Sequence, residues 1–214
     1  MFFLVIFAPI LALLLIYLGV MTWEENILGW FLVLVGAGYV VGGIVYAWRQ
    51  RGRGSIAREE RGDRSFWLIL PGFLAVFYAS PLEYLYLPER LPRTAWMQVL
   101  GVILIVLALG LRVWTRYAIR GMYTAHVQVV NEHRLVQEGP YRYIRHPGYA
   151  GFLLMALGIA VGYSSLLGLI STAFLLFPAL VYRMRVEEKL LLEQFGDEYR
   201  QYAAKTRLLL PGIW

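Results

Sequence analysis

Long uncharged apolar runs dominate the pattern of hydrophobic and polar positions along the chain. Residues without any Asp, Glu, Lys or Arg form five such runs, at 4–20, 28–48, 66–82, 97–111 and 147–182. A helix needs about 20 apolar residues to cross a bilayer core of about 30 Å. The runs therefore predict an all-α fold, that of a polytopic helical membrane protein.

The first four runs predict four membrane helices, with expected bounds of 2–22, 27–48, 66–87 and 96–118. The fifth run is longer than one simple span needs and short for two. The stretch Tyr163–Ser165 interrupts it near the middle, which predicts a helical hairpin with arms at about 149–163 and 166–186. The expected fold thus has about six membrane segments, the last two forming the hairpin. One long tilted helix is the alternative.

The basic residues predict how these helices are oriented. All but two of the 20 Lys and Arg residues fall in three segments, 49–64, 112–145 and 183–207. Basic residues favour the cytoplasmic side of membrane helices. A single long final helix would place the third segment on the opposite side, so the rule favours the hairpin. We therefore expect a multi-pass integral membrane protein with both termini in the cytoplasm.

The amino-acid composition limits the kinds of functional site that the chain can contain. The 214 residues are 59% hydrophobic and include no Cys, which excludes disulfides and thiolate metal sites within them. The net charge of +6 does not indicate a nucleic-acid partner, because the basic residues border apolar runs. The glycine-rich stretch 36–43 lies inside an apolar run, so Gly38 and Gly42 predict close helix packing rather than a nucleotide-binding loop.

The densest group of reactive side chains precedes the hairpin, in the sequence HRLVQEGPYRYIRHPGY at 133–149. Gly139-Pro140 predicts a turn, and Pro147 suits the first turn of a helix. Arg145 and His146 should then lie at the mouth of the hairpin, beside the free N–H groups of a helix N-terminus. The competing interpretation is that Arg and Tyr side chains here only anchor the chain in the headgroup region.

A second polar group follows the last apolar arm, in RMRVEEKLLLEQFGDEYRQY at 183–202. Arg183 and Glu187 are four residues apart, on one face of a helix that continues out of the arm. Charged side chains at this depth usually face a cavity or a partner. Glu187 and Glu188 could in principle bind a metal, but no His at helical spacing accompanies them, so we expect no metal site. Serine-nucleophile and phosphate-loop motifs are missing from the sequence.

Together these motifs resemble a known family. The pieces His133-Arg-Leu-Val136, Gly139-Pro-Tyr141 and Arg145-His-Pro-Gly-Tyr149 resemble the cofactor motif of isoprenylcysteine carboxyl methyltransferases, and phospholipid N-methyltransferases have a related pattern. The order Arg183-x-x-x-Glu187-Glu188, then Phe195-Gly196-x-Glu198-Tyr199-x-x-Tyr202, resembles the C-terminal signature of that superfamily. The resemblance covers about 126–211.

The resemblance implies an integral membrane methyltransferase that uses S-adenosylmethionine and has a cofactor pocket facing the cytoplasm. By position in the motifs, it implies cofactor contacts for Gln128, His133, Leu135, Val136, Tyr141, His146, Pro147, Gly148, Tyr149 and Glu187. It implies that Arg183 binds the methyl acceptor and that Arg183 and Glu187 serve catalysis. The chain then divides into N-terminal transmembrane helices, 1–118, and a catalytic region, 119–214.

The nature of the acceptor stays open from the sequence. A lipophilic acceptor is expected, because the polar cluster lies where a cytoplasmic pocket meets lipid. The carboxylate of an isoprenylcysteine-like molecule is the first expectation; an amino-lipid nitrogen and a small thiol are alternatives. A transporter would instead need ionisable residues deep in the spans, and the first four expected spans show almost none. A structural membrane protein would use the polar cluster only as an anchor.

Overall fold

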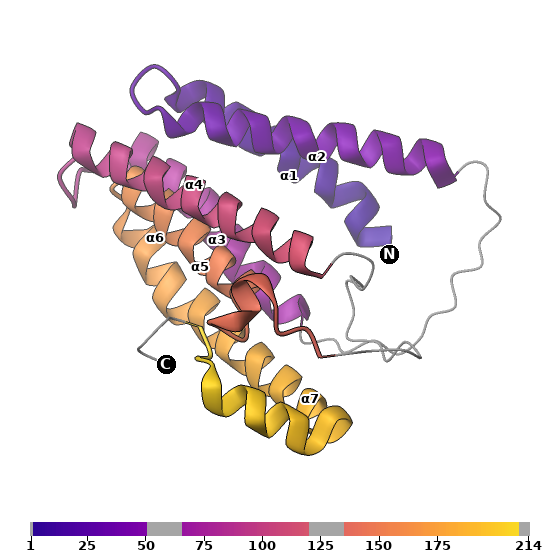
Figure 1. The fold of residues 1–214 in the computed structure, drawn as a ribbon. Helices are drawn as coiled ribbons and strands as arrows, with labels where there is room; N and C mark the ends of the chain where they lie inside the picture. The colour runs from indigo at the N-terminus through magenta and orange to yellow at the C-terminus, as the bar shows by residue number, and fades with distance from the viewer. Residues whose placement is uncertain (1, 51–65, 120–134, 210–214) are drawn as a thin grey trace.

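The computed structural model describes residues 2–50, 66–119 and 135–209, and these ranges are helical apart from short connections (Figure 1). The elements are, in order, α1 (Phe2–Thr22), α2 (Leu28–Gln50), α3 (Phe66–Tyr86), α4 (Ala95–Ala118), the 3-10 turn η1 (Gly139–Arg142), α5 (Pro147–Gly162), α6 (Leu166–Ser171), the π-helical turn η2 (Thr172–Leu176) and α7 (Phe177–Lys205). The all-α prediction is confirmed, and the four expected N-terminal helices agree with α1 to α4 within two residues at each end.

Helices α1 and α2 form an antiparallel pair that lies across the remaining helices (Figure 1). Gly19 of α1 and Gly29 of α2 face each other, and a Cβ on either would lie 2.6 Å from the carbonyl oxygen of the other. Two side chains tie the turn of this pair to the end of α5. Asn26 Nδ2 donates to the carbonyl of Gly162 at 2.8 Å, and Thr22 Oγ1 lies 3.0 Å from Tyr163 Oη.

The glycine prediction for α2 was only half right. Glycines do allow close packing between α1 and α2, but they are Gly29 and Gly36, whose Cα hydrogens face the backbone of α1. Gly38 has no heavy atom of the described ranges within 4 Å of a Cβ built on it, so it does not pack against α1 there. The surroundings of Gly42 lie outside the described residues. Hydrophobic periodicity places a glycine in a helix but does not tell which side of that helix meets a neighbour.

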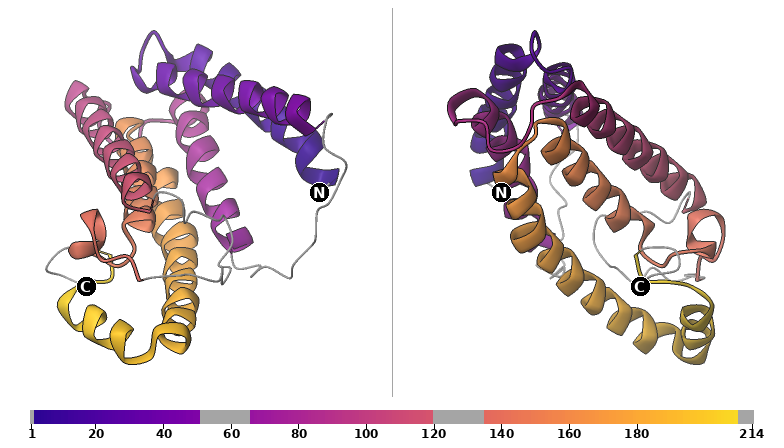
Figure 2. Two further views of the ribbon diagram at one scale, coloured as in Figure 1. Left: turned by 45° about the vertical axis from the view of Figure 1, so that its right-hand side comes forward. Right: turned by 90° about the vertical axis from the view of Figure 1, so that its left-hand side faces the viewer.

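The last apolar run folds as a helical hairpin, as predicted. Helix α5 ends at Gly162, Ser164 adopts a positive φ of 49°, and Ser165 caps the next helix by accepting a hydrogen bond from the Gly168 amide at 2.8 Å. From Leu166 the second arm continues through η2 and α7 to Lys205, a length of 40 residues that Gly196 interrupts with a φ of 52°. The two arms meet at the turn and diverge away from it, and the last part of α7 runs back toward the start of α5 (Figure 2).

The hairpin packs on α4 through its first arm and on α3 through its second. Gly101 of α4 contacts the backbone of Gly158 and Gly162, so these two helices approach closely. Gly72 of α3 lies against the backbone of Leu176 in η2 in the same way. Small residues at such crossings allow the close backbone contact by which membrane helices associate. Helices α3 and α4 and the two arms of the hairpin therefore form the framework that carries the predicted site.

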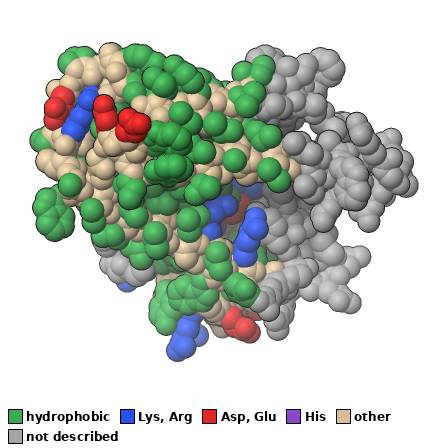
Figure 3. All heavy atoms as spheres, turned by 90° about the horizontal axis from the view of Figure 1, so that it is seen from above, with side chains coloured by type: hydrophobic (Ala, Val, Ile, Leu, Met, Phe, Trp, Pro, Cys, Tyr) green, Lys and Arg blue, Asp and Glu red, His purple; other side chains and the backbone are tan. Residues whose placement is uncertain are grey.

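The composition of the helices is that of a membrane protein. Three stretches in the described ranges are long and apolar enough to cross a bilayer, Leu68–Tyr86, Ala95–Ala118 and Leu166–Lys205, and shorter apolar helices accompany them. Hydrophobic side chains cover most of the described part of the face drawn in Figure 3, and charged side chains form small separate groups on it. The number of spans, about six, stays a prediction.

A buried carboxylate holds the hairpin turn against α3. Glu83 is 3% exposed, and its Oε2 accepts hydrogen bonds from Ser165 Oγ at 2.6 Å and from the Leu167 amide at 2.7 Å. Its other oxygen, Oε1, and Ser80 Oγ are buried without a hydrogen-bond partner among the described residues. Glu83 thus satisfies two donors at the start of the second arm, which would otherwise be buried and unpaired.

We expect Glu83→Ala to destabilise the protein by about 2 kcal/mol or more, because two buried donors lose their acceptor. Glu83→Gln should cost less than about 1 kcal/mol, since its carbonyl oxygen can accept both bonds and its amide can donate toward Ser80. Unfolding in mixed micelles titrated with sodium dodecyl sulfate measures the change in unfolding free energy of both variants. Glu24→Ala, which removes an exposed carboxylate between α1 and α2, is the control. Equal losses for the alanine and glutamine variants would contradict this role.

Candidate functional site

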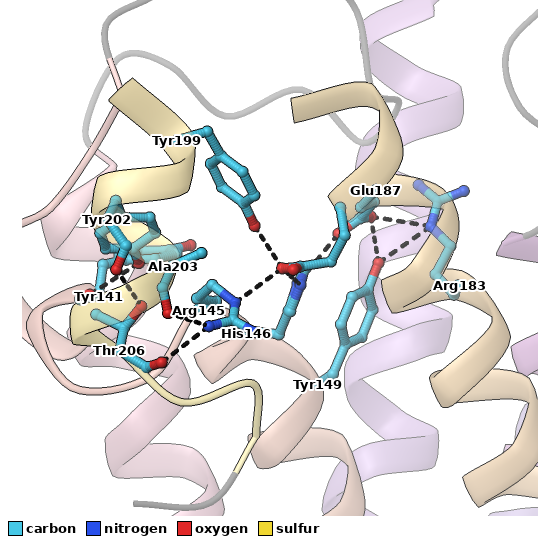
Figure 4. Close-up of polar contacts among 11 residues, drawn as sticks. Tyr141, Arg145, His146, Tyr149, Arg183, Glu187, Tyr199, Tyr202, Ala203 and Thr206 are labelled. Carbon is cyan, nitrogen blue, oxygen red and sulfur yellow. Dashed lines mark hydrogen bonds and ion pairs between the residues drawn. The ribbon is translucent and has the colours of Figure 1, made fainter. Parts of the chain in front are cut away.

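Four of the predicted site residues, His146, Tyr149, Arg183 and Glu187, gather at the end of the hairpin opposite its turn, where α5 begins and α7 leaves the bundle (Figure 4). The turn η1 leads into it: Gly139 has a φ of +61°, a conformation that favours glycine, and Pro140 follows it. Pro147 is the first residue of α5, as the sequence predicted. His146 takes the N-cap position, but its side chain does not cap the helix and points instead to α7.

The first half of the site joins Arg183, Glu187 and Tyr149. Arg183 is 3% exposed, and its Nε donates to Glu187 Oε1 at 2.9 Å and to Tyr149 Oη at 3.0 Å. The Tyr149 hydroxyl donates in turn to Glu187 Oε1. The i,i+4 pair expected from the sequence is therefore a buried ion pair, closed by a tyrosine from the other arm of the hairpin. Pairing of this kind is what allows charges to be buried at all.

The second half of the site is built on the imidazole of His146. Its Nε2 lies 2.9 Å from Glu188 Oε1 and its Nδ1 lies 3.5 Å from Glu187 Oε2. Burial by itself would lower the pKa of His146, but the hydrogen bonds and charges of Glu187 and Glu188 outweigh burial and hold this pKa above its ordinary value. The ring therefore bridges the two neighbouring carboxylates and favours its protonated form.

Glu188 also binds groups that the sequence analysis did not assign to the site. Its Oε1 accepts a hydrogen bond from Arg145 Nε at 3.0 Å and another from the Tyr199 hydroxyl. Both residues stood in the quoted motifs, so the signal was present, but nothing in their spacing showed that they meet one carboxylate. With His146 protonated, three cations (Arg145, His146 and Arg183) face two carboxylates. The cluster thus carries net positive charge and suits an anionic ligand group.

The other predicted residues lie around this cluster or outside the described ranges. Pro147 and Gly148 form the first turn of α5. Among the described residues, no heavy atom lies within 4 Å of a Cβ built on Gly148, so these residues leave open space beside the helix N-terminus. The carbonyl of Tyr141 accepts a hydrogen bond from Tyr202 Oη at 2.8 Å. Leu135 and Val136 precede η1 and are half-buried. Gln128 and His133 lie outside the described residues. The cofactor contacts assigned to all of these residues stay predictions.

The stability of the protein should depend on pH through His146. The folded protein holds the pKa of His146 above its unfolded value of about 6.5. The stability that protonated His146 contributes is therefore fully present below about pH 6.5 and is lost as pH rises through the folded pKa. The difference in Tm between the wild type and His146→Gln should therefore be largest near about pH 6 and shrink toward about pH 9. Thermal unfolding in detergent measures it. A difference that grows with pH would mean that His146 is buried neutral.

Comparison with known proteins supports one family. Residues 96–198 match the model of the phospholipid methyltransferase family. A probable protein-S-isoprenylcysteine O-methyltransferase of Oryza sativa subsp. indica is 35% identical over 91 residues, which cover 42% of this chain and 48% of the relative. The Saccharomyces cerevisiae protein-S-isoprenylcysteine O-methyltransferase is 34% identical over 117 residues, covering 54% and 49%. The chain spans about half the length of these two relatives.

The fold agrees with these matches. A solved structure of a eukaryotic intramembrane Ras methyltransferase, isoprenylcysteine carboxyl methyltransferase, is similar with a TM-score of 0.57 and 18% sequence identity, over 94% of this chain and 73% of that one. Likeness at this identity concerns the fold alone. Residues 96–198 thus resemble the phospholipid methyltransferase family, and the curated relatives that match the chain are isoprenylcysteine O-methyltransferases.

Proposed function

We propose that the protein is an S-adenosylmethionine-dependent methyltransferase that methylates the carboxylate of an isoprenylcysteine-like lipid. The observation that carries this proposal is the buried Arg183, paired with Glu187 where an apolar helix emerges from the bundle. A guanidinium at such a place can hold a carboxylate brought to it from the bilayer. The relatives named for isoprenylcysteine methylation support the same acceptor.

The residues of the site fit the proposed cofactor. Its amino-acid part and ribose need both anionic and cationic partners, and Glu187 and His146 offer these side by side. The open space at Gly148 gives room for a ligand next to the N-terminus of α5, where peptide N–H groups and the helix dipole favour a carboxylate. Glu187 already contacts three groups, Tyr149 and Arg183 through Oε1 and His146 through Oε2, so Oε2 has one lone pair left that could accept from a ligand.

When bound, S-adenosylmethionine supplies an electrophilic methyl group on a sulfonium. The protein's part is mainly to bring the two reactants into line, because displacement at a methyl group depends on proximity and orientation. A carboxylate acceptor needs no general base. Arg183 would hold one acceptor oxygen by a charge-assisted hydrogen bond, and Tyr149 would fix the guanidinium from the side. Burial of these groups excludes water that would compete for the same contacts.

An amine acceptor is the second candidate, because the matching family model is that of phospholipid methyltransferases. The charge of the cluster favours a carboxylate, since three cations face two carboxylates when His146 is protonated. Regarding orientation, we propose that the site and both termini face the cytoplasm, because the basic segments share that side. We also propose that residues 119–214 carry the catalysis, because the residues of the cluster that Figure 4 labels all follow residue 119.

S-adenosylhomocysteine should raise the Tm of the detergent-solubilised protein, because a ligand that binds only the folded state stabilises it. At about 100 times Kd the gain is about 2.7 kcal/mol. Adenosine alone is the control and should give a smaller shift, since it lacks the amino-acid part. No shift and no heat of binding at saturating ligand would refute the methyltransferase proposal.

The identity of the methyl acceptor is tested with the same detergent-solubilised protein. Labelled S-adenosylmethionine and S-farnesylcysteine should give a product whose label is released by base as methanol, which identifies a methyl ester. Phosphatidylethanolamine and a long-chain thiol serve as the amine and thiol arms. A base-stable product from either arm, with none from S-farnesylcysteine, would replace the carboxylate in the proposal.

Arg183→Ala and Glu187→Ala should affect different ligands. Removing a charge-assisted contact costs about 1.5–3 kcal/mol, or roughly ten- to a hundredfold. Glu187→Ala should weaken S-adenosylhomocysteine binding by that factor. Arg183→Ala should keep the cofactor Kd within a few fold and lose turnover. Arg185→Ala, which removes an exposed arginine two residues away, should change neither. If Arg183→Ala abolishes cofactor binding while Glu187→Ala leaves it intact, the two roles are reversed.

A further inference from the structure

One oxygen of Glu188 accepts hydrogen bonds from three donors that belong to two separate segments of the chain. Oε1 accepts from Arg145 Nε at 3.0 Å, from His146 Nε2 at 2.9 Å and from the Tyr199 hydroxyl. Arg145 and His146 belong to the loop before α5, while Tyr199 lies beyond Gly196, whose φ of 52° interrupts α7. The Glu188 side chain is 25% exposed, so most of it is buried among these partners. A carboxylate with only a surface role would not have this environment.

The segment Tyr199–Leu209, which we name the strap, is fastened to the same loop. Arg145 Nη1 donates to the carbonyls of Ala203 at 2.9 Å and Thr206 at 2.8 Å. The backbones also pair: the Arg145 amide donates to the Arg207 carbonyl at 2.7 Å, and the His146 amide donates to the Leu208 carbonyl at 3.1 Å. Arg145 therefore connects Glu188 to the strap, and the strap fixes the backbone on which His146 stands (Figure 4).

This arrangement decides how the imidazole of His146 is presented. Because Nε2 is bound to Glu188, Nδ1 faces Glu187, the carboxylate to which we assign cofactor binding. Two carboxylates at opposite edges of the ring require a proton on each nitrogen. Without Glu188 the ring would lose this constraint, and Arg145 would lose the partner that holds it over the strap.

We propose that Glu188 is a positioning residue of the cofactor site: it orients His146 toward Glu187 and keeps the strap closed on the loop 143–146. The role in cofactor binding rests on the proposed function, whereas closure of the strap can be measured without any ligand. Glu188 makes no direct contact with the cofactor in this proposal, and it acts through His146 and Arg145.

The charges around His146 give the proposal a pH signature. From α7 the ring faces Glu187 and Glu188, from its own loop Arg145, and from α5 the ring of Tyr149 at 5.7 Å between centroids. Tyr199 reaches the same oxygen of Glu188 from the strap. Glu188→Gln keeps the shape of the side chain but removes one of the two negative charges. The pH at which His146 releases its proton should then fall.

The test compares Glu188→Gln with Glu193→Gln, the same chemical change at an exposed position on α7. Hydrogen exchange of the ligand-free, full-length protein is followed at three amides that pair the strap with the loop. They are those of Arg145 and His146, and that of Arg207, which donates to the Tyr143 carbonyl. The titration of His146 is followed by NMR, and S-adenosylhomocysteine affinity by calorimetry. For Glu188→Gln we expect exchange at these amides and Kd to rise by about tenfold each, and the titration midpoint of His146 to move to lower pH. Glu193→Gln should resemble the wild type in all three.

Tyr199→Phe is the milder second variant, in case Glu188→Gln does not fold. It removes one donor to Glu188 and should raise exchange at the same amides by a few fold. Two results would overturn the proposal. The first is that Glu188→Gln has the amide exchange rates and the His146 titration of the wild type. The second is that its amides exchange faster while Kd and the His146 titration are unchanged, which would leave Glu188 a structural contact only. Failure of the wild type to bind S-adenosylhomocysteine refutes the proposed function instead, and the exchange and titration results still decide whether Glu188 positions the loop and His146.

Discussion

Two adjacent carboxylates at the end of an apolar helix impose the constraint on which the rest of the site depends. Glu187 and Glu188 leave the bundle on α7 with side chains that are 17% and 25% exposed, so neither is fully solvated. Removing such charges from water costs several kcal/mol each unless cations and hydrogen-bond donors surround them. The chain supplies these groups from α7 itself, from the loop before α5 and from the strap. The contacts that hold the hairpin together at this end are therefore the same contacts that balance the charges of the site.

The hairpin is held by polar contacts at both ends and by apolar packing between them. At the turn, Glu83 caps the second arm and Asn26 binds the end of the first. At the other end, the carboxylate cluster joins the start of α5 to α7. The middle is closed by glycine contacts with α4 and α3. This division matches the bilayer, in which hydrophobic packing suits the core and polar groups are least costly near the surfaces.

Much of this could be predicted from the sequence, for identifiable reasons. Uncharged runs locate helices, Pro147 marks the start of α5, and the serines after Tyr163 break the last run. The contact of Arg183 with Glu187 follows from helical spacing. Contacts between segments far apart along the chain could not be predicted in this way. The meeting of Arg145, His146 and Tyr199 at Glu188 depends on how α7 bends at Gly196. Likewise, the choice of Gly36 over Gly38 for packing depends on the rotation of α2 about its own axis.

The pairing of the strap with the loop 143–146 also bears on how the protein is made. Synthesis runs from the N-terminus, so both arms of the hairpin leave the ribosome before Arg207 and Leu208 do. Until those residues emerge, the amides of Arg145 and His146 lack the carbonyls that they bind in the folded protein. The helices can insert and associate one after another, but the charged cluster reaches its final geometry only when the strap arrives. The contacts of this site therefore cannot all form before the strap has been synthesised.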